Sequence, residues 1–197
     1  KQSGGSGQYG HVKITFSPGE AEGLTFTESV FGGAVPKNFF PAVEKGLRES
    51  ALKGVLAGYP MVGIKATLVD GSYHPVDSSE MSFKMAASLA YKECMKLANP
   101  VLLEPVMRLE VVTPEESMGD VIADLNKRRG AVMGMDPASR KGYTTVHAVA
   151  PKAELVEYPI ALRAMTQGRG SFEYKVTGYD TVPGNIAEKI KKDNAPA

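Results

Sequence analysis

Between Met61 and Asp70, apolar and polar residues alternate, which predicts a strand with one buried face. The apolar residues that follow recur three and four positions apart, and this spacing predicts an amphipathic helix over residues 78–98. The loop between the two, residues 71–80, is therefore expected to project from the end of a rigid strand and helix.

This loop ends in a helix-capping signal. The run Asp77-Ser78-Ser79-Glu80 predicts a capping box in which Asp77 accepts hydrogen bonds from first-turn amides and Glu80 reaches back. Such a cap would fix one side of the loop and leave residues 71–74 exposed. The run and His74 contain the side-chain types of a hydrolase triad, but residues so close in sequence rarely converge as base, orienting group and nucleophile. A cap beside an exposed histidine accounts for all of them, and catalysis is not expected here.

The pattern before Met61 predicts two further strands and a helix. Residues 12–16 and 24–30 alternate and are separated by a turn, so they are expected to form a two-stranded antiparallel unit. Such a pair is not stable alone and must be covered. The next helix runs to about residue 53, with Val43, Leu47 and Ala51 on its buried stripe. The order is β-β-α-β-α, one sheet covered by two helices.

After Asn99-Pro100, which ends the long helix, the order of elements restarts. The patterns predict the β-α-β-β-α-β order of a ferredoxin-like sandwich, followed by a helix over residues 183–192. Thr113-Pro114-Glu115-Glu116 predicts a capping box with a proline at the first helical position. An α+β protein with two domains, residues 1–99 and 100–197, is expected. In the second domain the strands are predicted at residues 107–113, 131–135, 143–150 and 172–179, and the helices between residues 113 and 130 and over residues 153–166.

The composition is that of an ordinary globular protein, with 43% hydrophobic and 23% charged residues. The formal net charge is only +1, so any contact with nucleic acid has to be local. The sequence contains no apolar run of membrane length and no secretory signal pattern, so no membrane partner is expected. The single Cys94 excludes an internal disulfide framework and fits a cytoplasmic location. The chain begins without Met inside a glycine-rich loop, so it is expected to be a piece of a longer protein.

Residues 4–10 contain the spacing Gly-x-Gly-x-x-Gly, which binds phosphate in some proteins. A dinucleotide-binding fingerprint needs a strand before it and a helix after it, whereas residues 11–16 alternate as a strand. The sequence also contains neither the kinase signatures nor the Gly-Lys of a P-loop. A flexible hairpin or loop is therefore predicted, and a phosphate-binding enzyme is the weakest hypothesis. The histidines at positions 11, 74 and 147 have no metal-ligand spacing, so no metal is expected.

Arginines 128 and 129 stand at the end of a predicted helix, where the helix dipole would stabilise them without any partner. An RNA contact is the other explanation. Further basic residues follow near the last predicted helix and strand, and acidic residues lie among them. Whether the surface that they form has a positive or a negative net charge is therefore left open. The basic residues are Arg163, Arg169 and Lys175, and the acidic ones are Glu154, Glu157 and Glu173.

Many separate blocks of the sequence, in one order, resemble domains IV and V of elongation factor G, a translational GTPase. They cover nearly the whole chain, so the resemblance is specific. The blocks are residues 2–5, 7–12, 32–33, 35–37, 54–60, 70–74, 76–81, 98–105, 114–116, 118–121, 128–130 and 165–170.

The resemblance implies a ribosomal protein S5 domain 2-like fold for the first domain, without its first strand, and a ferredoxin-like second domain. In the family, domain IV enters the ribosomal A site, beside the decoding centre, during translocation of tRNA and mRNA. Domain V packs near the GTPase-associated region of the large ribosomal subunit. The resemblance also implies a G domain holding GTP and Mg before Lys1. This piece itself is expected to have no cofactor and no enzymatic activity.

Carried over residue by residue, the resemblance implies two tip loops that contact RNA. Glycine lets a backbone approach a sugar-phosphate chain closely, and His and hydroxyl groups recognise the shape and 2′-hydroxyls of a codon–anticodon helix. Arg128, Arg129 and Arg169 are implied to contact the large ribosomal subunit. One loop consists of Gly4, Gly5, Ser6 and Gly7, and the other of Ser72, Tyr73, His74, Pro75 and Val76.

Two positions depart from the family pattern. Ser6 stands where a basic residue is common, which would remove a phosphate contact and flatten the salt dependence of binding. Pro75 stands where an acidic residue is usual, which stiffens the loop after His74. Both indicate a divergent paralogue of elongation factor G.

The leading hypothesis is a monomeric, ribosome-binding, non-catalytic piece of such a protein, with rRNA, the A-site tRNA–mRNA duplex and ribosomal proteins as partners. A ribosomal protection factor of the tetracycline-resistance type, or a ribosome recycling factor, is the alternative within the family. A protein-interaction module that uses these folds is the hypothesis from another class.

Overall fold

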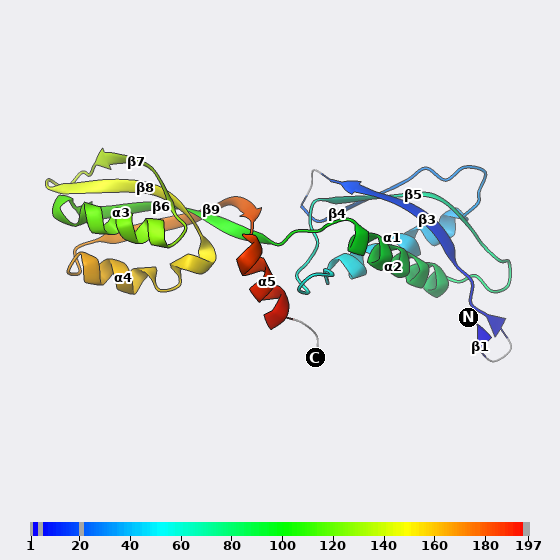
Figure 1. The fold of residues 1–197 in the computed structure, drawn as a ribbon. Coiled ribbons are helices and arrows are strands. Elements are labelled where there is room, and N and C mark those ends of the chain that lie inside the picture. The colour runs from blue at the N-terminus through cyan, green and yellow to red at the C-terminus, as the bar shows by residue number, and fades with distance from the viewer. Residues whose placement is uncertain (1, 4–5, 20–21, 195–197) are drawn as a thin grey trace. The chain divides into compact units, whose positions relative to one another are not determined.

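The computed structural model describes residues 2–3, 6–19 and 22–194. The chain divides into two compact units, residues 1–101 with 185–197, and residues 102–184. Each unit contains a sheet and helices (Figure 1), so the predicted α+β class with two sheet-containing domains is confirmed.

The first unit contains the predicted order β-β-α-β-α. Two short strands, β1 (Gln2–Ser3) and β2 (Ser6–Gly7), pair with each other ahead of this sheet. The main elements are β3 (His11–Pro18), β4 (Leu24–Glu28), the 3-10 turn η1 (Lys37–Phe39), α1 (Phe40–Ala51), β5 (Ile64–Ser72) and α2 (Glu80–Leu97).

Strand β5 lies between β3 and β4. It runs antiparallel to β3 and parallel to β4, so the predicted direct pairing of residues 12–16 with 24–30 is wrong. The two strands do run in opposite directions, but a third strand separates them. Strand β5 has the most deeply buried face, with Ile64, Ala66 and Leu68 at most 6% exposed, and the central position covers such a strand on both edges.

Helices α1 and α2 cover one face of this sheet and pack against each other (Figure 1). Their approach is close at Gly46, where a Cβ would lie 2.4 Å from the carbonyl oxygen of Lys84, so a larger residue would force the helices apart. The stripe predicted on α1 is confirmed, since its three members are buried. The core is Val35, Ala42, Val43, Leu47, Ala51, Ile64, Ala66, Leu68, Phe83, Ala87, Tyr91 and Met95.

The second unit has the β-α-β-β-α-β order predicted for it. Its four strands form one antiparallel sheet in the order β7-β8-β6-β9, with α3 and α4 on one face (Figure 1). The elements are β6 (Leu103–Pro114), η2 (Glu115–Ser117), α3 (Met118–Lys127), β7 (Ala131–Pro137), β8 (Tyr143–Pro151), η3 (Lys152–Leu155), α4 (Tyr158–Met165) and β9 (Ser171–Thr181).

The start of α3 differs from the predicted capping box. Strand β6 continues through Pro114, and a 3-10 turn precedes the helix without a side-chain cap. The hydroxyl of Thr113 is buried and donates to the carbonyl oxygen of Pro114, so it cannot cap the helix. The last helix, α5 (Gly184–Asp193), lies where the sequence predicts one.

Candidate functional site

The antiparallel pair β3 and β5 sets two loops at one end of the first unit. His11 stands opposite Ser72, so the segment that enters β3 and the segment that leaves β5 start side by side (Figure 1). A Cβ on Gly71 would lie 2.3 Å from the carbonyl oxygen of His11, so this close strand contact needs a glycine. We call residues 7–10 and 72–79 together the tip.

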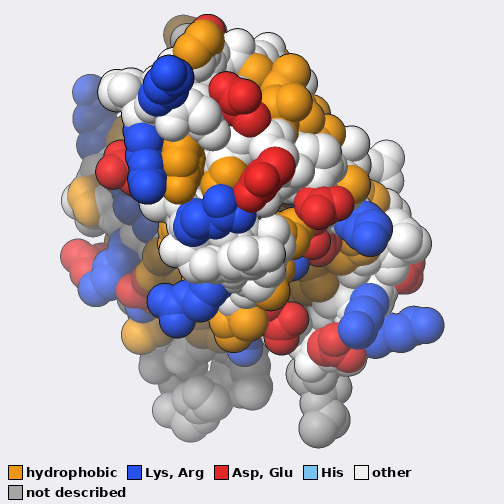
Figure 2. All heavy atoms as spheres, turned by 90° about the vertical axis from the view of Figure 1, so that its left-hand side faces the viewer, with side chains coloured by type: hydrophobic (Ala, Val, Ile, Leu, Met, Phe, Trp, Pro, Cys, Tyr) orange, Lys and Arg blue, Asp and Glu red, His pale blue; other side chains and the backbone are white. Residues whose placement is uncertain are grey.

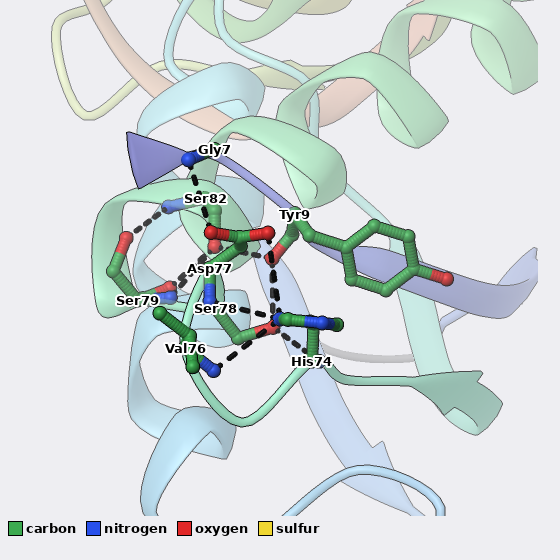
Figure 3. A network of polar contacts seen from close by, with 8 residues as sticks. All are labelled: Gly7, Tyr9, His74, Val76, Asp77, Ser78, Ser79 and Ser82. Carbon is green, nitrogen blue, oxygen red and sulfur yellow. Dashed lines mark hydrogen bonds and ion pairs between the residues drawn. The ribbon is translucent and has the colours of Figure 1, made fainter. Parts of the chain in front are cut away.

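The imidazole of His74 is oriented by its own loop (Figure 3). Its Nδ1 accepts hydrogen bonds from the backbone N–H groups of Asp77, at 3.1 Å, and Val76, at 3.3 Å. A ring nitrogen that accepts hydrogen bonds carries no proton, so neutral His74 is protonated on Nε2. The side chain is 53% exposed, and no hydrogen bond within the described part of the chain uses Nε2. His74 therefore presents an N–H donor at the tip.

Ser78 closes the turn around this histidine. Its hydroxyl accepts the backbone N–H of His74 at 2.9 Å and donates to the carbonyl oxygen of Tyr9 at 2.8 Å. Its own N–H donates to the carbonyl oxygen of His74 at 3.1 Å. One serine side chain thus joins the two segments of the tip.

Asp77 joins the same two segments through its carboxylate and its carbonyl oxygen (Figure 3). Its Oδ1 accepts the backbone N–H of Gly7 at 2.9 Å, and its carbonyl oxygen accepts the N–H of Tyr9 at 2.9 Å. Its Oδ2 lies 3.4 Å from Nδ1 of His74, a contact that becomes an ion pair only when the imidazole is protonated. A Cβ on Gly7 would lie 2.8 Å from this carboxyl group.

The cap of α2 is not the predicted one. Ser79 is the N-cap, and its hydroxyl accepts the N–H of Ser82 at 3.1 Å while the Ser82 hydroxyl accepts the N–H of Ser79 at 2.9 Å. The predicted roles of Asp77 and Glu80 as the two halves of a capping box are therefore wrong. Asp77 lies before the cap residue and is occupied by Gly7, and the short Ser82 side chain takes the position predicted for Glu80.

A second polar cluster lies where β3 and β5 meet the tip. The hydroxyl of Ser72 is 2.7 Å from the hydroxyl of Tyr9 and 2.9 Å from Nδ1 of His11. Next to it, Lys13 donates to Asp70 at 2.8 Å. This bond and one from the backbone of Gly71 lower the pKa of the Asp70 carboxyl. Sequence reasoning missed Tyr9 and His11 as neighbours of Ser72, although the alternation of Tyr9, His11 and Lys13 around the start of β3 is a signal for a shared face.

The remaining predicted tip residues differ in their exposure. The side chains of Tyr73 and Val76 are open to solvent, at 47% and 77% exposed, and Pro75 is exposed between them. Gly7 lies beside the His74 loop, as the hydrogen bond to Asp77 shows. Ser6 lies in β2, and Gly4 and Gly5 fall outside the described residues, so the roles predicted for these three stay predictions.

In the second unit, the predicted arginines are engaged within the chain. Arg129 binds both oxygens of Glu104, at 2.6 and 2.9 Å, and Glu154 at 2.9 Å. The hydrogen bonds to Glu104 raise the pKa of its guanidinium, so the group stays charged. Arg128 binds Asp124 at 2.6 Å and lies over the ring of Tyr158. We call Arg128, Arg129 and these partners the arginine cluster.

Arg129 also has an uncommon backbone. It lies in the left-handed region with φ +55°, just after α3, and the N–H of Gly130 closes the helix end on the carbonyl oxygen of Leu125 at 2.9 Å. A non-glycine residue at such a position costs about 1 kcal/mol. Its ion pairs offset that cost. The third predicted arginine, Arg169, is paired with Glu116 and lies away from this cluster in sequence.

Charge is mixed on the face of the molecule shown in Figure 2. Lys and Arg side chains lie among Asp and Glu side chains, with hydrophobic patches between them. No single sign dominates this face, in agreement with the net charge of +1.

Metal ligation and membrane spanning have no support in the described part of the chain. Within residues 2–3, 6–19 and 22–194, no group of three or more His, Cys, Asp or Glu side chains is placed to hold a metal ion. No helix in the same part of the chain is long and apolar enough to cross a membrane.

Comparison with known proteins identifies two matching family models. Residues 1–99 match the model of elongation factor G, domain IV, and residues 101–190 match the model of the elongation factor G C-terminus. A solved structure from Thermus thermophilus is similar to 99% of the chain, with 45% sequence identity and a TM-score of 0.88. The chain corresponds to 29% of the length of that protein.

Proposed function

The chain belongs to the elongation factor G family, and from this premise we propose that it is a ribosome-binding part of an elongation factor G-like translational GTPase. In this proposal the tip enters the ribosomal A site, beside the decoding centre, and promotes translocation of tRNA and mRNA. GTP and Mg would be held by a G domain elsewhere in the full-length protein, which would work as a monomer in the cytoplasm.

The observation that carries the proposal is the geometry of the tip. Two loops meet at one end of a rigid sheet, and the Nε2–H of His74 is presented beside exposed backbone. Phosphate and 2′-hydroxyl oxygens of RNA are hydrogen-bond acceptors that such a donor fits. In the arginine cluster, by contrast, the charges are used inside the unit, so the ribosome contacts predicted there depend on the groups left exposed.

Binding of the chain to purified bacterial 70S ribosomes with a vacant A site tests the first part of the proposal. The association constant is expected to fall as salt rises, because RNA phosphates are among the contacts. Binding that does not respond to salt would favour a protein partner and contradict the RNA contact.

Substitution of His74 tests the role of the tip. His74→Ala is expected to weaken ribosome binding about tenfold, since a hydrogen bond to a charged or polar RNA oxygen is worth on the order of 1.4 kcal/mol. The same substitution in an elongation factor G whose two corresponding domains are replaced by this chain is expected to slow translocation, measured by stopped-flow fluorescence. Unchanged binding and unchanged translocation would exclude this role for His74.

A ribosomal protection or recycling factor is the second candidate. It is favoured by Ser6 and Pro75, the two positions where the tip departs from the family pattern. The elongation factor G that carries this chain in place of its own two domains distinguishes the candidates. If it releases tetracycline from ribosomes, or splits ribosomes together with a recycling partner, but does not translocate, the second candidate is favoured.

A further inference from the structure

Beyond Ser72, the last residue of β5, the two loops of the tip lie outside the main sheet. They are held together by the pair Asp77 and Ser78, whose groups reach the backbone of the opposite segment at Gly7 and Tyr9. Of these contacts, the bond from the N–H of Gly7 to the Asp77 carboxylate is the one in which an ionised side chain holds the glycine-rich segment.

Asp77 is also in contact with the imidazole that the tip presents. Its backbone N–H fixes Nδ1 of His74 as an acceptor, and its Oδ2 lies 3.4 Å from the same atom. One residue thus contacts both the glycine-rich segment and the histidine. The Asp77 side chain is 31% exposed, so water competes only in part for these contacts.

We propose that Asp77 is a positioning residue that couples the glycine-rich segment to His74, so that the two loops of the tip contact RNA as one unit. The inference rests on the proposed function, since it names how the same site is organised. Asp77 does not touch the RNA in this account. It acts by fixing Gly7 and the His74 ring relative to each other.

The free chain provides a test that does not depend on ribosome binding. In NMR spectra, the amide proton of Gly7 is expected to shift as the pH is lowered through the titration of Asp77, because its acceptor loses charge. Asp70→Asn, which removes a carboxylate from the neighbouring strand, should leave that shift in place. A Gly7 amide signal that does not follow the ionisation of Asp77 would overturn the coupling, whether or not the chain binds ribosomes.

Ribosome binding then tests the consequence. Asp77→Ala is expected to reduce affinity about fivefold to tenfold without lowering the melting temperature by more than a few degrees. Asp77→Asn keeps an oxygen acceptor for Gly7 and should restore most of the affinity. Equal losses in the Ala and Asn variants would show that charge alone matters and would contradict the positioning role.

Gly7→Ala changes the other partner in the contact between Gly7 and the Asp77 carboxylate. Its added Cβ would lie 2.8 Å from the Asp77 carboxyl, so the carboxyl must move, and affinity is expected to fall as it does for Asp77→Ala. In the Asp77→Ala background that clash is absent, so Gly7→Ala should cause little further loss. Fully additive losses would overturn the proposal. If the wild-type chain does not bind ribosomes while the Gly7 signal titrates, the proposed function fails and the coupling stands.

Discussion

In the tip, Asp77 and Ser78 direct their side chains to backbone groups of a neighbouring loop, whereas in the arginine cluster Arg129 binds side-chain carboxylates of two other elements. Among the described residues, the tip bonds leave the Nε2 donor of His74 without a hydrogen-bond partner, while the arginine bonds use the charges inside the unit. Polar residues of the tip therefore organise a surface, and those of the cluster hold a fold together. That a side chain is polar or charged does not show, from the sequence alone, which of these two uses it has.

The largest effect is expected from Arg129→Ala, which would break the pairs with Glu104 and Glu154. The Glu104 side chain is 12% exposed and would be left without its partner, so the free energy of unfolding of the second unit should fall by about 2 kcal/mol. Denaturant unfolding measures this. Exposed Arg163, on α4, is the matched control, and Arg163→Ala should change stability by about 0.5 kcal/mol or less.

Ribosome binding by folded Arg129→Ala should change little if the cluster is structural. A tenfold loss of affinity with unchanged stability would contradict a structural role of the arginine cluster and make Arg129 a ribosome contact.

Two neighbouring serines sharpen the comparison inside the tip. Ser79→Ala removes the N-cap of α2 and should lower stability by about 1 kcal/mol without weakening binding per folded molecule. Ser78→Ala removes the hydroxyl that accepts the N–H of His74 and donates to the carbonyl oxygen of Tyr9, and it should weaken binding more than it lowers stability. Thermal unfolding and ribosome binding of both variants measure the two effects. If the two variants lose stability and ribosome affinity to the same extent, the helix cap and the loop contact do not have the separate roles proposed for them.

The smallest effect concerns the exposed pair of Lys13 and Asp70. The hydrogen bond from Lys13, followed by that from Gly71, lowers the pKa of Asp70 in the folded state. A lowered carboxyl pKa contributes stability above the unfolded value of about 3.9, and this contribution is lost as the pH falls through the folded pKa. Melting temperatures between pH 7 and pH 3 should therefore decline slightly more for the wild type than for Asp70→Asn. A large difference would show that exposed pairs matter as much as the arginine cluster.

Most of the fold could be predicted from the sequence, because the buried face of a helix or strand requires apolar residues at a regular spacing along the chain. The stripe of Val43, Leu47 and Ala51 and the alternation before residue 70 identified their helix and strand, and the order of elements in both units is confirmed. The neighbour of a strand could not be predicted this way. Alternation reports which face of β3 and β4 is buried, but not that β5 lies between them.

The candidate site was predicted less completely. The prominence of the loop around His74 followed from its place between a strand and a helix, and Gly7 lies beside it as the resemblance implied. The partners of individual polar side chains could not be predicted, because Asp and Ser fit a cap and a loop contact equally well. Asp77 was therefore assigned to the wrong bond, and Ser82 was not recognised as part of the cap.

The central position of β5 has a consequence for biosynthesis. Strands β3 and β4 precede β5 in the chain, and among the described residues β5 is their neighbour in the main sheet, so the edges that it covers stay unpaired until β5, which follows α1, has left the peptide exit tunnel. Unpaired strand edges of this kind are the ones that chaperones protect. The sheet of the first unit is thus completed by β5, and a pause in synthesis before residue 72 would leave an aggregation-prone nascent chain.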